Sequence, residues 1–328
     1  GQHTMFLFLS SLVVLVLSVW MAIYIHHTSE PPPPDFGSGR MFDQIATRYD
    51  TINRVLALRM DISWRHQMTT RIRDLLLLSS QDKEDEWKIL DMATGTADVA
   101  LQLAKDMPPS TTILGLDPSE NMLQVGRDKI AKHQLDSRIS LEQADARDLS
   151  KYPAGTFDAA TMAFGIRNVP EPRQTALCEI HRLLKPDRGI LGILEFSEPD
   201  DSHGVLGMMA RGFIRYIVPL VGGILSGAPQ EYLHLQNSIQ DFPSPEDFRT
   251  LLESLNCPGH FQMEPVTHLN FGSVQLYVGR AIGGKETLAS SSAQQQQQQQ
   301  QQEQIRDDPV LPPIHSAAPK LEEETAHQ

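Results

Sequence analysis

The sequence predicts an α/β fold, a doubly wound sheet of seven strands with helices on both faces. Residues 88–98 support this first, because an apolar run ends in Asp91, a turn of small residues follows, and helical spacing begins at Asp98. Residues 111–117 support it next, as a second apolar run that ends in an acid, Asp117. Strand-like and helix-like segments then alternate along the chain, which is typical of βα units in a parallel sheet.

The turn in the first of these units suits a bound nucleotide. Its small residues, among them Gly95 and Thr96, let a ligand approach the backbone where the helix begins and its N–H groups are free. Asp117 follows about 20 residues later, where nucleotide-binding folds place a carboxylate on ribose hydroxyls. A plain packing turn explains the small residues equally well. A nicotinamide dinucleotide site is disfavoured, because it normally needs three glycines and only Gly95 stands in this window.

The remaining strands place further polar residues at the same edge of the sheet. A third strand over 138–143 is followed by Asp145, and a fourth over 156–164 is followed by Arg167 and Asn168. Ligands of open α/β sheets bind beyond the carboxyl ends of the strands, so Arg167 and Asn168 are well placed for chemistry. The alternative is a helix-capping asparagine beside a surface arginine. The fifth strand and two closing antiparallel strands are expected over 190–196, 260–267 and 273–280, and further helices over 171–184 and 244–255.

Composition divides the chain outside the sheet. Residues 5–25 carry no charge, and as a helix they would be about 30 Å long, the thickness of a hydrocarbon core. A cleaved signal sequence is the rival interpretation of this run. The predicted domains are a membrane anchor (1–27), a Pro-rich linker (28–40), the α/β domain (41–281) and a disordered Gln-, Pro- and Glu-rich tail (282–328).

Two segments of the α/β domain lie outside the alternating pattern. Residues 41–78, which include Tyr49, are predicted to be a helical preface, with a solvated helical cap as the alternative. Residues 204–227 are apolar but contain Arg211 and Arg215 and are interrupted by Pro219 and by Gly222-Gly223, so they predict a poor spanning helix. A lid or an interfacial segment with its arginines beside apolar residues fits this pattern, and so does a core or dimer face.

Charge and cysteine content exclude other classes of protein. The formal net charge of −13 argues against a general nucleic-acid binder, which needs clustered Lys and Arg. The two cysteines, Cys178 and Cys257, have neither ligand-like nor disulfide-like spacing and are interpreted as ordinary packed thiols. No Cys/His cluster predicts a metal site, so none is expected.

These motifs together resemble the quinone-biosynthesis C-methyltransferases of the UbiE/MenG type, which are class I S-adenosylmethionine-dependent enzymes. The resemblance covers residues 41–281, nearly three quarters of the chain. The matching blocks are Phe42-Asp-x-Ile-Ala-x-Arg-Tyr-Asp50, Asp91-x-Ala-x-Gly-Thr-x-Asp98, Phe164-Gly-Ile-Arg-Asn168, Leu184-Lys-Pro186 and Leu194-Glu-Phe-Ser197. The combination of Phe-Gly-x-Arg-Asn with Leu-Glu-Phe-Ser is specific to this family among methyltransferases.

The resemblance implies a Rossmann-like class I methyltransferase fold, S-adenosylmethionine as cofactor, and methylation of a ring carbon of a polyprenylated quinol. It implies catalytic roles for Arg167, Asn168 and Tyr49. The cofactor-binding residues that it implies are Asp91, Gly95, Thr96, Asp117, Asp145, Ala146 and Ala163. The residues do not distinguish a benzoquinol of ubiquinone synthesis from a naphthoquinol of menaquinone or phylloquinone synthesis.

The chain also departs from the family pattern. Ala97 stands where the family usually has the last glycine of Gly-Thr-Gly, which would cost about 1 kcal/mol if that position is left-handed. His234 stands where a second tyrosine is common. Ala97 motivates an alternative function, a non-catalytic scaffold subunit of a quinone-synthesis assembly.

The expected partners are the quinol lipid and a membrane, with other quinone-synthesis enzymes or a second copy as further candidates, and no nucleic acid. The glutamine run at 294–302 indicates a eukaryote, so the mitochondrial inner membrane is preferred and a plastid is the alternative.

Overall fold

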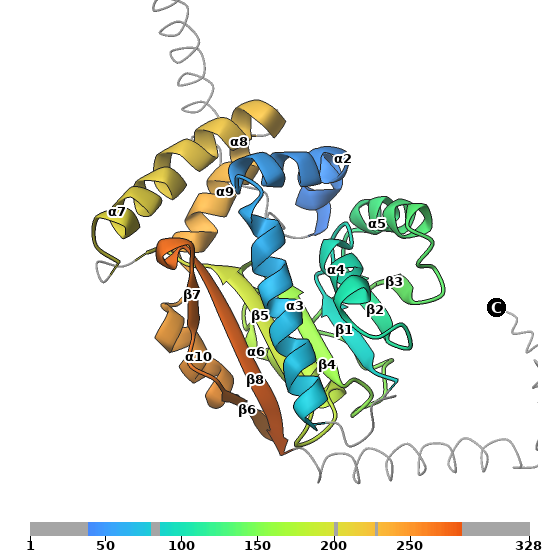
Figure 1. Cartoon of the computed structure of the whole chain (residues 1–328). Helices are drawn as coiled ribbons and strands as arrows, with labels where there is room; N and C mark the ends of the chain where they lie inside the picture. Colours follow the sequence, from blue (N-terminus) through green and yellow to red (C-terminus); the bar gives the residue numbers. More distant parts are fainter. Residues whose placement is uncertain (1–38, 80–85, 200–202, 227–228, 284–328) are drawn as a thin grey trace, which may run out of the picture. The chain divides into compact units, whose positions relative to one another are not determined.

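The computed structural model describes residues 39–79, 86–199, 203–226 and 229–283 of the chain (Figure 1). The predicted anchor with its transmembrane helix, most of the linker and most of the tail lie outside the described residues. The helices are α2 Gly39–Leu56, α3 Met60–Ser79, α4 Asp98–Asp106, α5 Glu120–Lys132, η1 Ile166–Asn168, α6 Gln174–Leu183, α7 Gly204–Gly212, η3 Phe213–Ile217, α8 Val218–Ser226, α9 Pro229–Gln240, α10 Pro245–Glu253 and η4 Asn270–Gly272. The strands are β1 Lys88–Met92, β2 Thr112–Asp117, β3 Ile139–Gln143, β4 Ala159–Ala163, β5 Ile190–Phe196, β6 Gly259–Met263, β7 Thr267–Leu269 and β8 Val274–Gly283.

The described strands form one sheet in the order β3-β2-β1-β4-β5-β8-β6, with β7 paired to β8. Strands β1 to β5 are parallel, and β8 runs antiparallel to β5, β6 and β7. The predicted α/β fold and its seven-strand path are confirmed. The eighth strand, β7, was not predicted, because three residues are too few to show a periodic pattern. The strand order reverses between β1 and β4, and open α/β sheets bind ligands at such a point.

Two hydrophobic cores lie on the two faces of the sheet, because successive strand residues point to opposite sides. Ile89 packs with side chains of α3 and α4, and its neighbour Leu90 packs with side chains of α6 and α10. Helices on both faces were predicted, and they are observed (Figure 1).

The helical preface is part of the domain and not a solvated cap. In α3, Met68 and Ile72 are fully buried. The helix lies directly on β5, since a Cβ added to Gly192 would meet Ile72 Cδ1 at 2.6 Å. Close approach of helix and strand therefore depends on the missing side chain at Gly192.

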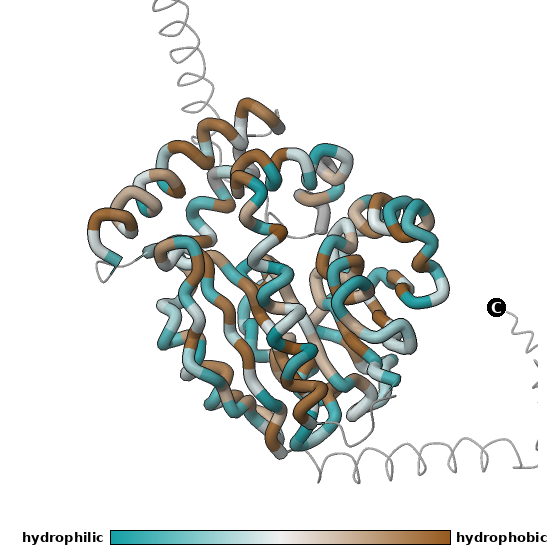
Figure 2. Tube along the Cα trace, viewed as in Figure 1, coloured by the Kyte–Doolittle hydropathy of each residue, from teal (hydrophilic) through white to brown (hydrophobic). Residues whose placement is uncertain are grey.

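The segment from Gly204 to Ser226 is helical throughout, so the predicted interruptions at Pro219 and at Gly222-Gly223 are wrong. It consists of α7, a π-helical turn η3 and α8, and its apolar stripe is visible in Figure 2. Pro219 has no N–H to donate, and the π-helical turn directly before it is where the hydrogen-bond register changes. Gly222 serves packing, since an added Cβ would meet the Tyr232 ring of α9 at 2.2 Å.

The interpretation of the cysteines as separate thiols is also wrong. Cys178 of α6 and Cys257, which precedes β6, are joined in a disulfide with a Cα–Cα distance of 6.0 Å. Their separation of 79 residues carries no disulfide signal. The fold brings them together because α6 and β6 are packed against each other.

Substitution of Gly222 should separate its packing role from helix propensity. Gly222→Ala should lower the free energy of unfolding by about 1–3 kcal/mol, because the new methyl collides with Tyr232. Gly212→Ala is the matched control in the same helical segment: an added Cβ has no atom within 4 Å, so helix propensity should raise stability by up to about 1 kcal/mol. Denaturant unfolding of the detergent-solubilised chain measures both, and equal effects would contradict this packing of α8 on α9.

Candidate active site

The predicted site residues gather at the carboxyl ends of β1 to β4. Asp91 lies near the end of β1 and Asp117 ends β2, while Asp145 follows β3 and Ala163 ends β4. Arg167 and Asn168 belong to the short helix η1, which begins at Ile166, shortly after the end of β4 at Ala163. Tyr49 comes from α2, far away in the sequence.

Asp91 fixes the turn that follows β1. Its Oδ2 accepts a 2.6 Å hydrogen bond from Thr94 Oγ1, and its Oδ1 accepts one of 2.6 Å from Thr161 Oγ1 of β4. Thr161 is the register partner of Asp91, which explains the second bond. Burial raises the pKa of Asp91 to about 6, although both hydroxyls favour the ionised form. Asp91 therefore shapes the turn, and direct contact with the cofactor remains a prediction.

The turn itself has an unusual backbone. Ala93, Gly95 and Ala97 all have positive φ, and Ala97 lies in the left-handed region at φ 65° and ψ 23°. The expected strain at Ala97 is therefore present, at about 1 kcal/mol. The alanine methyl is fully buried beside α4, and its burial offsets part of that strain. Ala97 is compatible with the glycine-type turn of the family.

Asp117 is held with its carboxylate against backbone N–H groups. Its Oδ2 accepts from Gly95 N at 2.8 Å and its Oδ1 accepts from Ser119 N at 2.9 Å. Each oxygen retains a second lone pair, so the carboxylate can also accept two ribose hydroxyls. Burial raises its pKa to about 6. These two acceptor oxygens, beside a turn of small residues, fit the ribose hydroxyls of S-adenosylmethionine.

Helix α2 is attached to this cofactor region by carboxylates. Asp50 accepts hydrogen bonds from Thr96 Oγ1 at 2.6 Å and from Lys129 Nζ at 2.9 Å. Asp43 accepts one of 2.5 Å from Ser119 Oγ. The predicted cofactor contact Thr96 is thus engaged by α2, which places this helix over the turn.

The other predicted cofactor residues are more open. Asp145 is exposed, and its carboxylate pairs with Arg147 of the same loop at 2.6 Å. Ala146 and Ala163 are half-buried. These residues lie on the correct edge of the sheet, and their contacts with the cofactor remain predictions.

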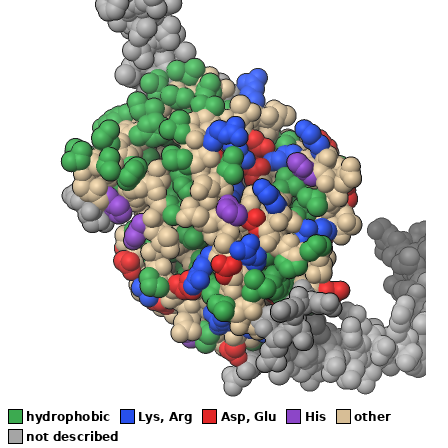
Figure 3. Space-filling model, in the orientation of Figure 1, with side chains coloured by type: hydrophobic (Ala, Val, Ile, Leu, Met, Phe, Trp, Pro, Cys, Tyr) green, Lys and Arg blue, Asp and Glu red, His purple; other side chains and the backbone are tan. Residues whose placement is uncertain are grey.

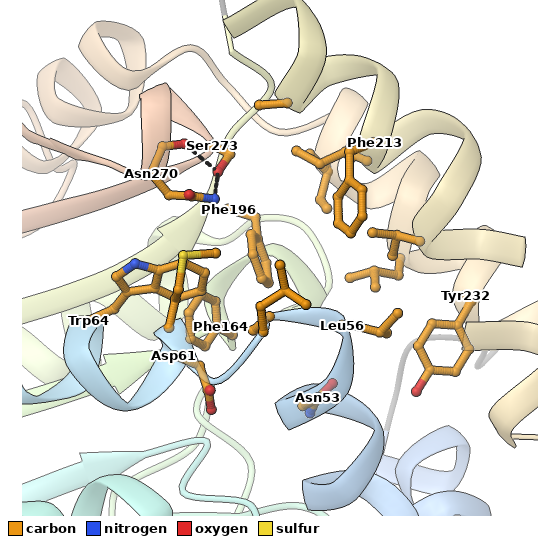
Figure 4. Close-up of a pocket in the computed structure, with 18 of the residues that line it drawn as sticks. Asn53, Leu56, Asp61, Trp64, Phe164, Phe196, Phe213, Tyr232, Asn270 and Ser273 are labelled. Atoms are coloured by element: carbon orange, nitrogen blue, oxygen red, sulfur yellow. Dashed lines mark hydrogen bonds between the residues drawn. The ribbon is translucent and has the colours of Figure 1, made fainter. Parts of the chain in front are cut away.

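A largely apolar cavity of about 540 Å³ lies between the strand ends and the helices α2, α7, η3 and α9. On the sheet side its wall is aromatic: the rings of Phe164 and Phe196 lie 4.5 Å apart by centroid, with Trp64 beside them. Figure 4 shows these three rings together and Phe213 across the space from them. The predicted catalytic residues Tyr49, Arg167 and Asn168 all line this cavity, and none of the predicted cofactor residues does.

Arg167 is one of two buried arginines that line the cavity, and both are paired: Arg65 Nη1 donates to Asp61 Oδ2 at 2.6 Å. Arg167 Nη1 forms a short ion pair with Glu195 of β5, and the backbone N of Arg167 donates to Glu195 Oε2 at 3.3 Å. Nη1 also donates to Phe164 O at 3.2 Å, and the guanidinium lies 5.4 Å from the centroid of the Phe196 ring. The buried Nε has no hydrogen-bond partner among the described residues. Glu195 is fully buried, so it holds the guanidinium in one orientation.

Two further side chains of the cavity are neutral near pH 7. Burial raises the pKa of the Tyr49 phenol, against the opposing effect of Arg167 and Arg65. Burial, together with the charge of Arg167, lowers the pKa of His234 on α9. A neutral tyrosine can donate a proton in a hydrogen bond, and a neutral imidazole can accept one.

Several residues of this site have no role that the sequence pattern predicts. Glu195, Asp50 and His234 were all visible in the family blocks or departures, but nothing in the pattern assigned them a role. Glu195 carries the strongest signal in retrospect, because an acid inside a continuous apolar strand must have a buried partner. Asp50 and His234 depend on how α2 and α9 pack, which no local pattern predicts.

Comparison with known proteins gives a consistent result. Residues 37–276 match the ubiE/COQ5 methyltransferase family. The "Ubiquinone/menaquinone biosynthesis C-methyltransferase UbiE" of Geobacter sulfurreducens is 39% identical over 241 residues, which cover 73% of this chain and 86% of the relative. The "Demethylmenaquinone methyltransferase" of Thermus thermophilus is 36% identical over 239 residues, which cover 73% of this chain and 99% of the relative. A solved SAM-dependent methyltransferase from Aquifex aeolicus has 18% identity and a TM-score of 0.42, covering 63% of this chain and 87% of its own.

Cofactor affinity should depend on pH through Asp117. The ionised carboxylate can accept two ribose hydroxyls, and protonation would remove one acceptor. Affinity for S-adenosylmethionine should therefore be constant well above pH 6 and weaken as the pH falls through the Asp117 pKa of about 6. Asp117→Asn should weaken binding about tenfold or more and abolish this dependence. Calorimetry across pH measures both, and an unchanged pH midpoint in Asp117→Asn would assign the dependence to Asp91.

Proposed function

The chain belongs to the ubiE/COQ5 methyltransferase family, and we propose that it transfers a methyl group to a ring carbon of a polyprenylated quinol in quinone biosynthesis. It is an enzyme dependent on S-adenosylmethionine, which supplies an activated methyl group when bound. The observation that carries the proposal is the apolar cavity beside the cofactor turn, with the guanidinium of Arg167, which follows β4, held in its wall by Glu195.

The methyl-transfer reaction requires the cavity to stabilise the negatively charged oxygen of a deprotonated quinol. A quinol ring carbon becomes nucleophilic when a ring hydroxyl loses its proton, and a phenol has a pKa near 10 in water. The ring carbon that gains the methyl group then releases its own hydrogen as a proton, which restores the aromatic ring. The apolar wall disfavours a bare anion, so a fixed positive group is needed beside the oxygen. Arg167 supplies it, and its Nε–H is available for the oxygen or for a water that takes the proton.

Glu195 orients the Arg167 guanidinium, but its negative charge also cancels part of the electrostatic field of that guanidinium. The ion pair of the buried carboxylate and the guanidinium has no net charge. It can therefore stabilise an oxyanion only at short range, through a directional hydrogen bond from the guanidinium. This arrangement favours a hydrogen bond to a developing oxyanion over general attraction of anions. Arg167 therefore acts on the transition state more than on binding.

The other cavity residues take complementary roles. Asn168 is half-buried in the wall and can donate a hydrogen bond to the ring oxygen. Tyr49, on the helix that lies over the cofactor turn, closes the site between donor and acceptor. His234 is neutral and can accept the hydroxyl proton directly or through water.

The cavity also suits the substrate class in its size and polarity. A volume of about 540 Å³ holds a drug-sized ligand, and the aromatic side chains Trp64, Phe164 and Phe196 suit a planar ring. Both benzoquinols and naphthoquinols satisfy these conditions. A lipid substrate places the enzyme at a membrane, with residues 5–25 as its anchor. The two named relatives are bacterial. The glutamine run of this chain favours a mitochondrial or plastid membrane.

Methyl transfer with isotope-labelled S-adenosylmethionine tests the proposal. The full chain in detergent should transfer the labelled methyl to a ring carbon of a short-tailed demethyl benzoquinol or naphthoquinol, identified by fragmentation mass spectrometry. Cofactor binding without transfer to either quinol would favour the scaffold alternative. Label on a ring oxygen would contradict C-methylation.

Arg167→Lys should reveal the directional role of the guanidinium. Lysine keeps a positive charge for Glu195 but loses the planar fork, so kcat should fall by about 10²-fold while the melting temperature and cofactor affinity change little. Arg173→Lys is the matched control: Arg173 lies in the loop between η1 and α6, pairs with Glu171, and does not line the cavity. Its kcat should be unchanged. A variant Arg167→Lys that melts early yet turns over normally per folded molecule would make Arg167 structural.

A further inference from the structure

The outer side of the helical segment Gly204–Ser226 is an exposed apolar surface. The residues that form it, called here the α7–α8 face, are Val205, Leu206, Met208, Met209, Phe213, Tyr216, Ile217, Ile224 and Leu225. Figure 3 shows hydrophobic side chains gathered over α7 and α8. Met208 and Tyr216 are 62% and 71% exposed, so the packing of the described domain does not account for them. A contiguous apolar surface of this kind marks an interaction site.

The α7–α8 face is continuous with the cavity. Leu206, Met209 and Phe213 belong to both, because they are exposed and also line the cavity. Leu58 of the α2–α3 turn and Phe271 of η4 share this property, with exposed fractions of 70% and 53%. These five side chains form an apolar mouth. The cavity therefore opens toward the same apolar surroundings that the face requires.

The charges of the segment favour a bilayer over a protein interface. Gly204–Ser226 contains Arg211 and Arg215 and no carboxylate. Arg211 Nε donates to Pro199 O at 2.9 Å, and Arg215 Nε pairs with Glu198 at 2.5 Å. Both arginines are therefore held at the residues that follow β5. Arginines at the border of an apolar helical face are typical of segments that lie in the headgroup region.

The segment lies along the domain, which argues against spanning. It is long and apolar enough to cross a bilayer by length and composition. Its inner side, however, lines the cavity through Ala210, Ile214 and Val218, and α8 packs on α9 and α2. A spanning orientation would remove these contacts and open the cavity.

We propose that the α7–α8 face docks on the surface of a lipid bilayer and that the mouth opens into its hydrocarbon. This proposal rests on the proposed quinol substrate: the cavity holds the ring and the nearest part of the tail, so a longer tail must leave through the mouth. Docking lets that tail stay in the bilayer while the ring reaches Arg167. The enzyme then does not have to extract the whole lipid from the bilayer, a step that would expose the apolar tail of the lipid to water.

Depth-dependent quenching tests the docking without requiring turnover. The only two cysteines of the chain form a disulfide, so an added cysteine is the single site for an environment-sensitive fluorophore. The full chain is reconstituted into phosphatidylcholine/phosphatidylglycerol vesicles with brominated acyl chains. A label at Met208→Cys should shift its emission to the blue and lose intensity. A label at Ser110→Cys, exposed just before β2 at the opposite end of the sheet, should do neither.

The outcomes of this experiment distinguish bilayer docking of the α7–α8 face from attachment by the anchor and from a dimer interface. Because both variants retain residues 5–25, attachment of the chain by an anchor affects them equally, and only docking buries Met208. Equal emission from the two labels would overturn the proposal. So would a Met208→Cys label that is unaffected by bromine but transfers energy to a second labelled copy, since the face would then be a dimer interface.

A kinetic comparison tests the consequence for the substrate. Val205 and Met208 belong to the face but do not line the cavity, so Val205→Glu/Met208→Glu should leave turnover of a short-tailed quinol in solution unchanged. It should raise the KM for a long-tailed quinol in vesicles about tenfold. Val205→Gln/Met208→Gln should have a smaller effect. An unchanged KM for the long-tailed quinol would contradict lateral entry, whereas no turnover of any quinol by the unaltered chain would contradict the proposed function instead.

Discussion

The buried ion pair between Arg167 and Glu195 is the interaction on which the arrangement of the site depends. Glu195 is fully buried in β5, and Arg167 follows β4, so the pair joins the carboxyl ends of two neighbouring strands. A buried pair adds little net stability, but loss of one partner leaves an uncompensated charge at a cost of about 3–5 kcal/mol. The pair is therefore best explained by orientation: it fixes a guanidinium in an apolar cavity where a flexible cation would not stay.

The proposed cofactor region and the cavity proposed for the methyl acceptor are joined by α2. Asp50 and Asp43 attach this helix to the cofactor turn, and Tyr49 of the same helix lines the cavity. The buried acids Asp91 and Asp117 have raised pKa values, so the folded state binds their protons more tightly than the unfolded state. The free energy of unfolding therefore falls as the pH rises from about 4 to 6 and both carboxyls ionise. At neutral pH both are charged in the folded state, and the full destabilisation from burying these charges is present. Such a destabilisation is expected at a ligand site.

The sequence predicted the parts of the fold that local patterns encode. Apolar runs ending in Asp91 and Asp117 correctly placed β1 and β2, and the position after β4 brought Arg167 into the cavity. Features that depend on tertiary packing were not predictable: the pairing of Glu195 with Arg167, the disulfide across 79 residues, and a helix that continues through Pro219. In each case the partner or the compensating contact comes from another element, and no spacing along the chain reveals it.

We propose that Arg167 and Glu195 act as one oriented unit in the methyl-transfer step. A double-mutant cycle on single-turnover transfer to a short-tailed quinol tests it most directly, with Arg167→Gln, Glu195→Gln and the double variant, each corrected for its folded fraction. We expect strong non-additivity: either single change removes most of the rate, and the double variant is no slower than Arg167→Gln alone. Additive effects on the logarithm of the rate, or a Glu195→Gln variant with unchanged rate, would show that the orientation of Arg167 does not depend on Glu195.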